Sequence, residues 1–180
     1  MTALALATAP PMLTPTGVCA RSARVADAKA ISALVDLWAD RGLTIRRPLG
    51  NVLSSLGDFV VAARTGFPSD VVACGALEAV GGFDVSGIAE IRSIAVDPTA
   101  AGLGAGRCVV EHLIAEAEAR GLSQLCLLTR TPGFFQRCGF NVVQPAELPL
   151  VYRDEHLAAQ GRTCDCRTAM IRQVAQASRL

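Results

Sequence analysis

Three glycines, Gly102, Gly104 and Gly106, fall at alternate positions between a short apolar strand (residues 90–96) and a helical pattern. The helical pattern is a single apolar face formed by Val109, Val110, Leu113, Ile114 and Ala117. A strand, a glycine loop and a helix start in this order bring unpaired backbone N–H groups and the positive end of a helix dipole to one spot. Such a spot suits a phosphate, and the alternative interpretation is a flexible Gly/Ala turn without a ligand.

The spacing of this loop excludes two common phosphate-binding motifs. A P-loop has Lys and then Ser or Thr after its last glycine, whereas Arg107 and Cys108 follow Gly106. A dinucleotide fingerprint has glycines at the first, third and sixth positions, and Arg107 takes the sixth position counted from Gly102. The sequence therefore predicts a different phosphate cradle, made by the backbone of Gly102, Leu103, Gly104, Ala105, Gly106 and Arg107.

Glu90 opens the apolar strand and is a candidate general base. We expect a carboxylate that is partly buried beside a cleft to have its pKa raised toward neutrality. It could then take a proton from an amine, directly or through a water. The alternative is that Glu90 pairs with Arg92, two residues further on and on the same face of the strand.

The elements that position these residues follow from periodicity and turn signals. We expect strands at 19–25, 58–64, 71–80, 90–96 and 124–129, a helix from Asp27 to about Asp40, short helices within 44–56 and 134–138, and a long helix from near Arg107 to Gly121. A further strand opens at Gly139-Phe140, and residues 165–175 fit either a strand or a helix. Residues 1–18 are uncharged and rich in Ala, Pro and Thr, so we expect a disordered leader followed by one domain over 19–180.

Composition favours one globular domain with a full-sized core. The chain has 180 residues, 51% of them hydrophobic, and a formal net charge of +1. This balance gives no reason to expect nucleic acid or an acidic membrane surface as a partner, and no apolar run is long enough to cross a bilayer. The seven cysteines are odd in number and lie mostly in apolar runs, which is typical of reduced thiols in a cytoplasmic protein. Cys164 and Cys166 lack a second Cys or His pair nearby, so we expect no metal.

The loop and its flanks resemble the GCN5-related N-acetyltransferases. The segment VDPTAAGLGAG is similar to the pyrophosphate loop of that family, with Ala101 where the family usually has Arg or Gln. The resemblance implies an α/β (α+β) fold with a mixed, mostly antiparallel sheet and flanking helices. It also implies acetyl-CoA as cosubstrate, whose pantetheine would lie along the end of the central strand at Ile94, Ala95 and Val96.

Two segments resemble one branch of that family more narrowly. ACGALEAV with EIRSIAVDP, and LTRTPGFFQRCGF, are similar to the acetyltransferase domain of the N-acetylglutamate synthases, over roughly residues 20–150. The kinase-like domain of the long synthases has no room here, so the resemblance implies a short, stand-alone form. Because dimers are common in the family, the resemblance also implies a homodimer.

The resemblance assigns roles for acetyl transfer. Glu90 would be the base, and Thr129 or Thr131 would donate a proton to the leaving thiolate. Many relatives have a tyrosine in the helix after the QLCLLT strand, where this chain has Phe134-Phe135, and we place Phe135 at the cofactor. The only tyrosine, Tyr152, is too far along the chain to match.

The acceptor that these segments imply is the α-amine of L-glutamate, a small amino acid, in the first committed step of arginine synthesis. The two carboxylates of glutamate are well bound by the paired N–H donors of arginine guanidinium groups. The candidate substrate-binding arginines are Arg46, Arg47, Arg92 and Arg130. Each arginine alone could be a solvated surface charge. The C-terminal segment GRTCDCRTAMIRQ departs from the usual Tyr-Asn-Tyr and Arg-x-Ser pattern, and Arg162 or Arg167 could stand in.

Two other functions remain open from the sequence. One is acetylation of a different small amine or of a protein N-terminus, although an arginine-rich cleft disfavours a cationic amine. The other is a non-catalytic coenzyme A sensor that kept the loop and lost turnover.

Overall fold

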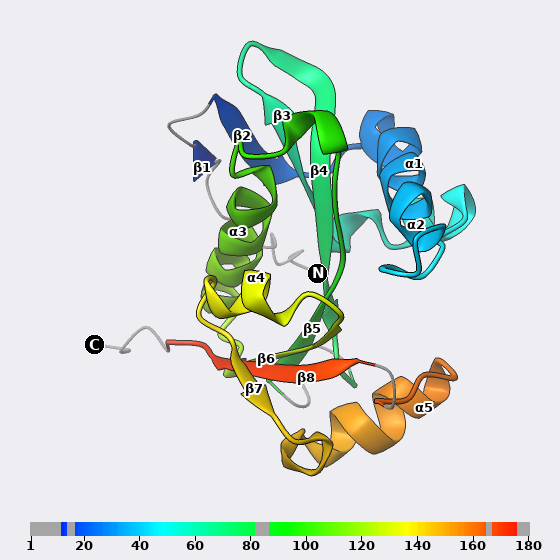
Figure 1. Ribbon diagram of the computed structural model, residues 1–180, viewed down its shortest axis with the longest axis vertical. Helices are drawn as coiled ribbons and strands as arrows, with labels where there is room; N and C mark the ends of the chain where they lie inside the picture. The colour runs from blue at the N-terminus through cyan, green and yellow to red at the C-terminus, as the bar shows by residue number, and fades with distance from the viewer. Residues whose placement is uncertain (1–11, 14–16, 82–86, 165–166, 176–180) are drawn as a thin grey trace, which may run out of the picture.

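The computed structural model describes residues 12–13, 17–81, 87–164 and 167–175. Its centre is a sheet of eight strands in the order β1-β2-β3-β4-β5-β6-β8-β7 (Figure 1). The strands are β1 Met12–Leu13, β2 Val18–Ser22, β3 Phe59–Arg64, β4 Phe67–Ala79, β5 Ile88–Val96, β6 Gln124–Thr129, β7 Asn141–Val143 and β8 Thr168–Gln173. All neighbouring pairs are antiparallel except β5 and β6, so the mixed, mostly antiparallel sheet expected from the sequence is confirmed.

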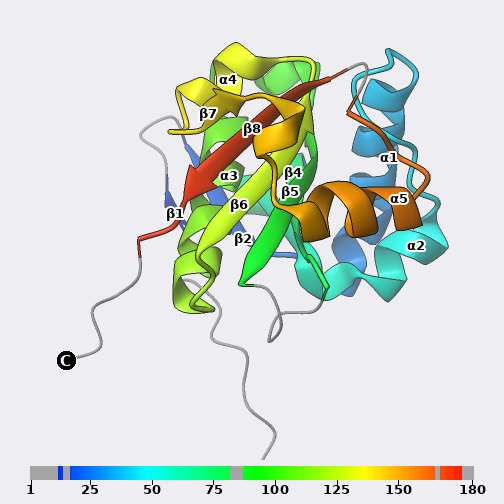
Figure 2. The same ribbon diagram turned by 90° about the horizontal axis from the view of Figure 1, so that it is seen from below.

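Helices cover both faces of this sheet. They are α1 Ala28–Ala39, α2 Leu49–Ser54, α3 Ala105–Ala119, α4 Pro132–Gln136, the π-helix η5 Val151–His156 and the short α5 Leu157–Ala159 that continues it. Short 3-10 turns lie at Val25–Asp27, Leu56–Asp58, Pro98–Ala100 and Pro145–Glu147. In both views α3 lies on one face, and α1 and α5 lie on the other (Figures 1 and 2).

The alternation of side chains along the strands explains this two-sided core. On β3, Val60 and Ala62 pack in the cluster that holds the apolar face of α3, whereas Phe59 and Val61 pack in the cluster of α1. Similarly, on β6 Leu125 and Leu127 belong to the α3 side, and Cys126 and Leu128 pack with Tyr152 and Leu157. Because both faces are apolar, these strands show continuous hydrophobic runs in the sequence.

Two predictions about the chain ends need correction or completion. The leader was expected to be disordered up to residue 18, but Met12–Leu13 pairs antiparallel with β2, and Val18 begins β2. Residues 1–11 and 14–16 lie outside the described residues. The undecided segment near residue 170 forms strand β8 between β6 and β7. Among the described residues, no helix has the length and apolar character needed to cross a membrane.

Candidate active site

A cavity of about 350 Å³ opens where β5 and β6 diverge. These two strands pair only from Ile88 to Glu90, so beyond Glu90 the edge of β5 opposite β4 has no paired strand among the described residues. The other edge of β5 has a bulge at this point, because Ser93 and Ile94 lie opposite the single residue Gly75 of β4, and Ser93 takes a left-handed φ of 56°. The walls come from β5, β6, α4, the end of α1 with its following loop, and two arginines near the C-terminus, Arg162 and Arg167.

The glycine loop lies between the end of β5 and α3, as the sequence predicts. Gly104 precedes the first residue of α3 with a φ of 72°, a conformation that glycine adopts without strain. At Gly106, an added Cβ would lie 2.9 Å from Cγ2 of Val96, so glycine here lets the helix start pack against β5. At Gly102, with φ 82°, nothing lies within 4 Å of an added Cβ. The loop therefore has open space beside Gly102, and it leads to the first-turn amides of α3, which have no partner within the helix.

The other cofactor residues fall at the same cavity. Ile94, Ala95 and Val96 line it from the open edge of β5, and the carbonyl of Val96 also accepts a 2.7 Å hydrogen bond from Nε1 of Trp38. Phe135 lines it too, but the residue is only 6% exposed and belongs mainly to the core. The side chain of Arg107 points to solvent and pairs with Glu111 at 2.6 Å, so only its backbone is available to the cradle.

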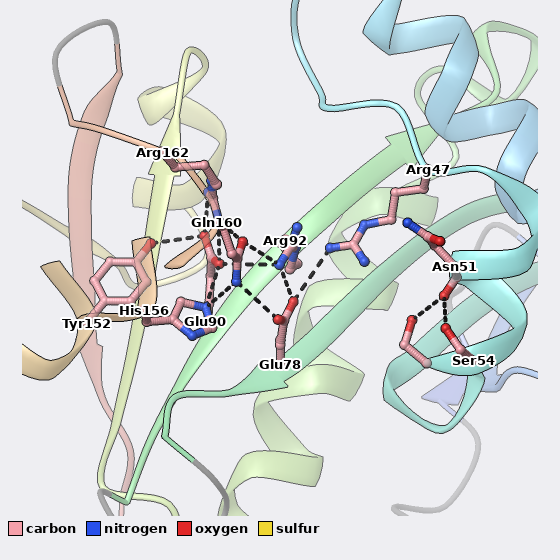
Figure 3. A network of polar contacts seen from close by, with 11 residues as sticks. Arg47, Asn51, Ser54, Glu78, Glu90, Arg92, Tyr152, His156, Gln160 and Arg162 are labelled. Atoms are coloured by element: carbon pink, nitrogen blue, oxygen red, sulfur yellow. Dashed lines mark hydrogen bonds and ion pairs between the residues drawn. The ribbon is translucent and has the colours of Figure 1, made fainter. Parts of the chain in front are cut away.

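Glu90 lies at the fork between β5 and β6 and is 1% exposed. Its carboxylate accepts two hydrogen bonds from the Arg162 guanidinium, at 2.6 and 2.7 Å, and one from the Tyr152 hydroxyl at 2.9 Å. Nε2 of His156 lies 3.3 Å from Oε2. Figure 3 shows these three side chains converging on Glu90 from the segment after β7.

The expectation of a raised pKa for Glu90 is wrong. Burial alone would raise it, but the hydrogen bonds from His156 and Arg162 and the charges of Arg162 and Arg92 outweigh burial. Together they lower the pKa of Glu90 to about 2. In this arrangement Glu90 is a stable carboxylate rather than a group ready to accept a proton.

A second carboxylate, Glu78 on β4, lies on the other side of Arg92. Nη1 of Arg92 donates to Glu78 and, at 2.9 Å, to Oε1 of Gln160. Nη2 of Arg47 lies 3.5 Å from the same Glu78 oxygen, and burial with the neighbouring Arg92 charge lowers the pKa of Arg47. The cluster thus alternates cations and anions from Arg47 across the sheet to Arg162 (Figure 3).

The structure separates the four predicted substrate arginines. Arg92 lines the cavity from β5 and Arg130 lines it from the end of β6. Arg47 joins the cluster through Glu78. Arg46 does not reach the site: its side chain is 61% exposed and pairs with Asp40 and Asp36 on the outer side of α1. The predicted role of Arg46 is therefore corrected to a surface ion pair, because consecutive residues before α2 point in different directions.

The two threonines lie together at the end of β6. Both line the cavity, and Oγ1 of Thr129 accepts a 3.0 Å hydrogen bond from the Thr131 amide. Their hydroxyl oxygens are 3.2 Å apart. A hydroxyl at this position can donate toward a group that lies in the cavity between β5 and β6.

Comparisons with known proteins support the likeness suggested by the loop. Residues 55–142 match the family model for the acetyltransferase (GNAT) domain. An N-acetyltransferase of Chlorobaculum tepidum is 33% identical over 148 residues, which covers 82% of this chain and 91% of the relative. An amino-acid acetyltransferase of Mycobacterium tuberculosis is 33% identical over 135 residues, or 75% of each chain. The chain belongs to the GNAT family of acetyltransferases.

Solved structures agree with this placement. Rv2747 from M. tuberculosis, in complex with CoA and NLQ, superposes with a TM-score of 0.75 at 27% identity, covering 87% of this chain and 99% of that one. The N-acetylglutamate synthase of Neisseria gonorrhoeae, complexed with coenzyme A and N-acetyl-glutamate, gives 0.74 at 25% identity, covering 88% and 35%. The predicted GNAT fold, acyltransferase activity and acetyl-CoA cosubstrate are therefore confirmed.

Sequence reasoning missed much of the polar shell around Glu90 in this acetyltransferase. From the sequence, Tyr152 is too far along the chain to match the family pattern, Arg162 has no defined position, and no motif marks Glu78, His156 or Gln160. The chain has one tyrosine, in a weakly patterned stretch, and this was the available signal, since the hydroxyl of a tyrosine that becomes buried needs a polar partner.

The same shell bears on the prediction that no metal is bound. Among the described residues, ligand atoms of Glu78, Glu90 and His156 lie within 4.8 Å of one another. Both carboxylates, however, already pair with guanidinium groups of Arg92 and Arg162. These positive charges would repel a divalent cation, so the cluster is better suited to an anion.

Proposed function

We propose that this acetyltransferase moves the acetyl group of acetyl-CoA to the α-amine of L-glutamate, as in the first committed step of arginine synthesis. The observation that carries the acceptor class is the charge of the cavity wall. Four arginines line it, Arg92, Arg130, Arg162 and Arg167, against one carboxylate, Glu90. An acceptor with more carboxylates than amines offsets this excess, whereas a cationic amine would be repelled.

The cosubstrate would lie across the fork between β5 and β6. The amides at the start of α3 and the loop around Gly102 and Gly104 would hold the pyrophosphate. The free edge of β5 at Ile94–Val96 would hydrogen-bond the pantetheine amides, as a missing neighbouring strand would. We therefore expect the thioester to lie near Glu90 and Thr129, which both line the cavity.

The transfer requires two protons to leave the acceptor ammonium. The first must leave before the nitrogen lone pair can attack the thioester carbon, and we assign it to Glu90, directly or through a water. Glu90 is the one carboxylate among the described cavity residues. The C–N bond then forms, the C–S bond breaks, one proton ends on the CoA sulfur and the other passes to solvent. Thr129 or Thr131 would hydrogen-bond the leaving sulfur.

The relatives support this acceptor. The gonococcal synthase was solved with coenzyme A and N-acetyl-glutamate, and its acetyltransferase region has the fold of this chain. The mycobacterial relative is named an amino-acid acetyltransferase. A homodimer remains a prediction from the family likeness, as does a cytoplasmic location.

The test is the release of coenzyme A from acetyl-CoA across a panel of free amino acids and amines. We expect turnover with L-glutamate well above L-aspartate, L-glutamine and cationic amines. Glu90→Gln should lose most of this turnover while still binding CoA. Arg153→Ala, which removes an arginine paired with Asp154 outside the cavity, is the matched control and should keep it.

Other results would redirect the proposal. Preferred turnover of an uncharged or cationic acceptor would contradict the charge argument and leave the acetyl transfer in place. Tight CoA binding without turnover of any acceptor would favour a protein N-terminus as acceptor or a sensor.

A further inference from the structure

The hydrogen bonds that Glu90 accepts in the structure conflict with its proposed role as the base that takes a proton from the acceptor amine. A carboxylate has about four lone-pair positions. Arg162 occupies one on each oxygen, Tyr152 takes a second on Oε1, and His156 lies beside Oε2. Oε1 therefore has no lone pair free for an amine or a bridging water, and the one position left on Oε2 faces Nε2 of His156. One of these partners must leave before Glu90 can act as a base.

Arg162 is the partner best placed to leave. Tyr152 is fully buried and packs in the core with Cys126, Leu128 and Leu157, so its ring is fixed. Arg162, in contrast, lines the cavity, and its side chain keeps 13% of its surface exposed. It follows α5, where its backbone amide donates to Leu157 at 2.8 Å. The guanidinium can therefore turn from Glu90 toward the cavity without a change in the core.

An acceptor carboxylate is the natural alternative partner for Arg162. The guanidinium already makes a two-pronged contact with one carboxylate, and an equivalent fork can form with another. Around the cluster, Arg47, Arg92 and Arg162 face Glu78 and Glu90, three cations against two anions. One added carboxylate balances these charges, so the exchange costs little electrostatic energy.

We propose that Arg162 is a positioning residue that releases Glu90 when an acceptor carboxylate takes over its guanidinium. This inference rests on the proposed function. Acceptor binding then does two things at once: it fixes the acceptor at Arg162 and frees a lone pair of Glu90 toward the acceptor amine. Amines without a carboxylate leave Glu90 paired, so they are discriminated against in the chemical step as well as in binding.

Other charged and titratable groups lie around Glu90, and they determine how large the effect is. The charged ones are Glu78 on β4 and Arg92 on β5, and the titratable ones are Cys126 on β6 and Tyr152 and His156 on η5. Arg92 lies 3.9 Å from Oε2 and stays with Glu78, so Glu90 keeps one positive neighbour after Arg162 turns away. When Arg162 turns away, Glu90 therefore loses two hydrogen bonds but does not become an isolated buried charge.

The test is a double-mutant cycle on ligand binding, which needs no turnover. The probe is N-acetyl-L-glutamate, which has carboxylates but no ammonium, titrated by calorimetry into CoA-saturated protein. Glu90→Gln removes the internal competitor for Arg162, so the probe should bind roughly tenfold more tightly. In the Arg162→Ala background, the same Glu90→Gln change should give no gain. Arg153→Ala, outside the cavity, serves as the matched control.

The outcomes separate this exchange from simpler explanations. A gain from Glu90→Gln that persists without Arg162 would mean plain repulsion between carboxylates and would overturn the proposal. No gain in Glu90→Gln, or no binding of the probe or of N-acetylglycine to any variant, would overturn it as well. Should Arg162→Ala fail to fold, Arg162→Lys keeps the charge without the fork, and the gain should shrink severalfold. An intact cycle with N-acetylglycine, together with no turnover of glutamate, would reject only glutamate as the acceptor.

Discussion

The low pKa of Glu90 makes a quantitative prediction about stability. The pKa falls from its ordinary value of 4.5 to about 2 in the folded chain, which is a change of about 2.5 units. At about 1.4 kcal/mol per unit, the folded state gains about 3 kcal/mol from the ionised carboxylate. Because the folded pKa is the lower one, this gain is complete above pH 5 and is lost as the pH falls toward 2. By linkage, about 2 kcal/mol of it is already lost at pH 3.

The perturbation is Glu90→Gln, which removes the titrating group and keeps its shape. Urea unfolding of both proteins between pH 3 and 5 gives the difference in unfolding free energy at each pH. That difference should shrink by about 2 kcal/mol from pH 5 to pH 3. Glu118→Gln, on the exposed surface of α3, controls for the loss of one negative charge. A difference that stays constant within about 0.5 kcal/mol would refute the ion-paired Glu90 of the structure.

Three further substitutions test other parts of the site. Gly102→Val places a branched side chain in the open space of the loop at a φ of 82°, so CoA affinity measured by calorimetry should fall at least roughly tenfold. Tyr152→Phe removes the 2.9 Å hydrogen bond to Glu90 and should lower the urea unfolding free energy by about 1.5–3 kcal/mol at pH 7. Arg47→Ala should raise the KM for the acceptor roughly tenfold with unchanged CoA affinity, whereas Arg46→Ala, at the surface, should change neither. Equal losses in acceptor and CoA binding for Arg47→Ala would indicate a structural role.

The cofactor half of the site was predictable from the sequence because its determinants are local. The strand 90–96, the glycines and the apolar face from Val109 to Ala117 follow one another within 28 residues, and each has its own periodic or turn signal. The structure has β5 ending at Val96 and α3 beginning at Ala105, as this pattern requires. The burial of β3 and β6 on both faces also follows from their continuous apolar runs.

The acceptor half could not be predicted, because its contacts are long-range. The hydrogen-bond partners of Glu90 lie 62, 66 and 72 residues further along the chain, at Tyr152, His156 and Arg162. Two of them belong to a π-helix, whose wider turn does not produce the 3.6-residue pattern used to find helices. Without these partners, the sequence shows only burial and the nearby Arg92 as influences on Glu90, and burial alone gives the wrong sign for its pKa shift.

The position of Glu90 explains why the C-terminal half of the chain is needed at all. Glu90 is the last residue of β5 that pairs with β6, so it lies at the point where the two strands begin to separate. At that point, one face of the sheet is covered by the apolar cluster that includes α3. The other face would be open without η5 and α5. A carboxylate there must be either solvated or paired, and the segment from Tyr152 to Arg162 supplies the pairing while excluding water. Only one of those partners, Arg162, also lines the cavity among the described residues, which is why the acceptor itself can decide when Glu90 is released.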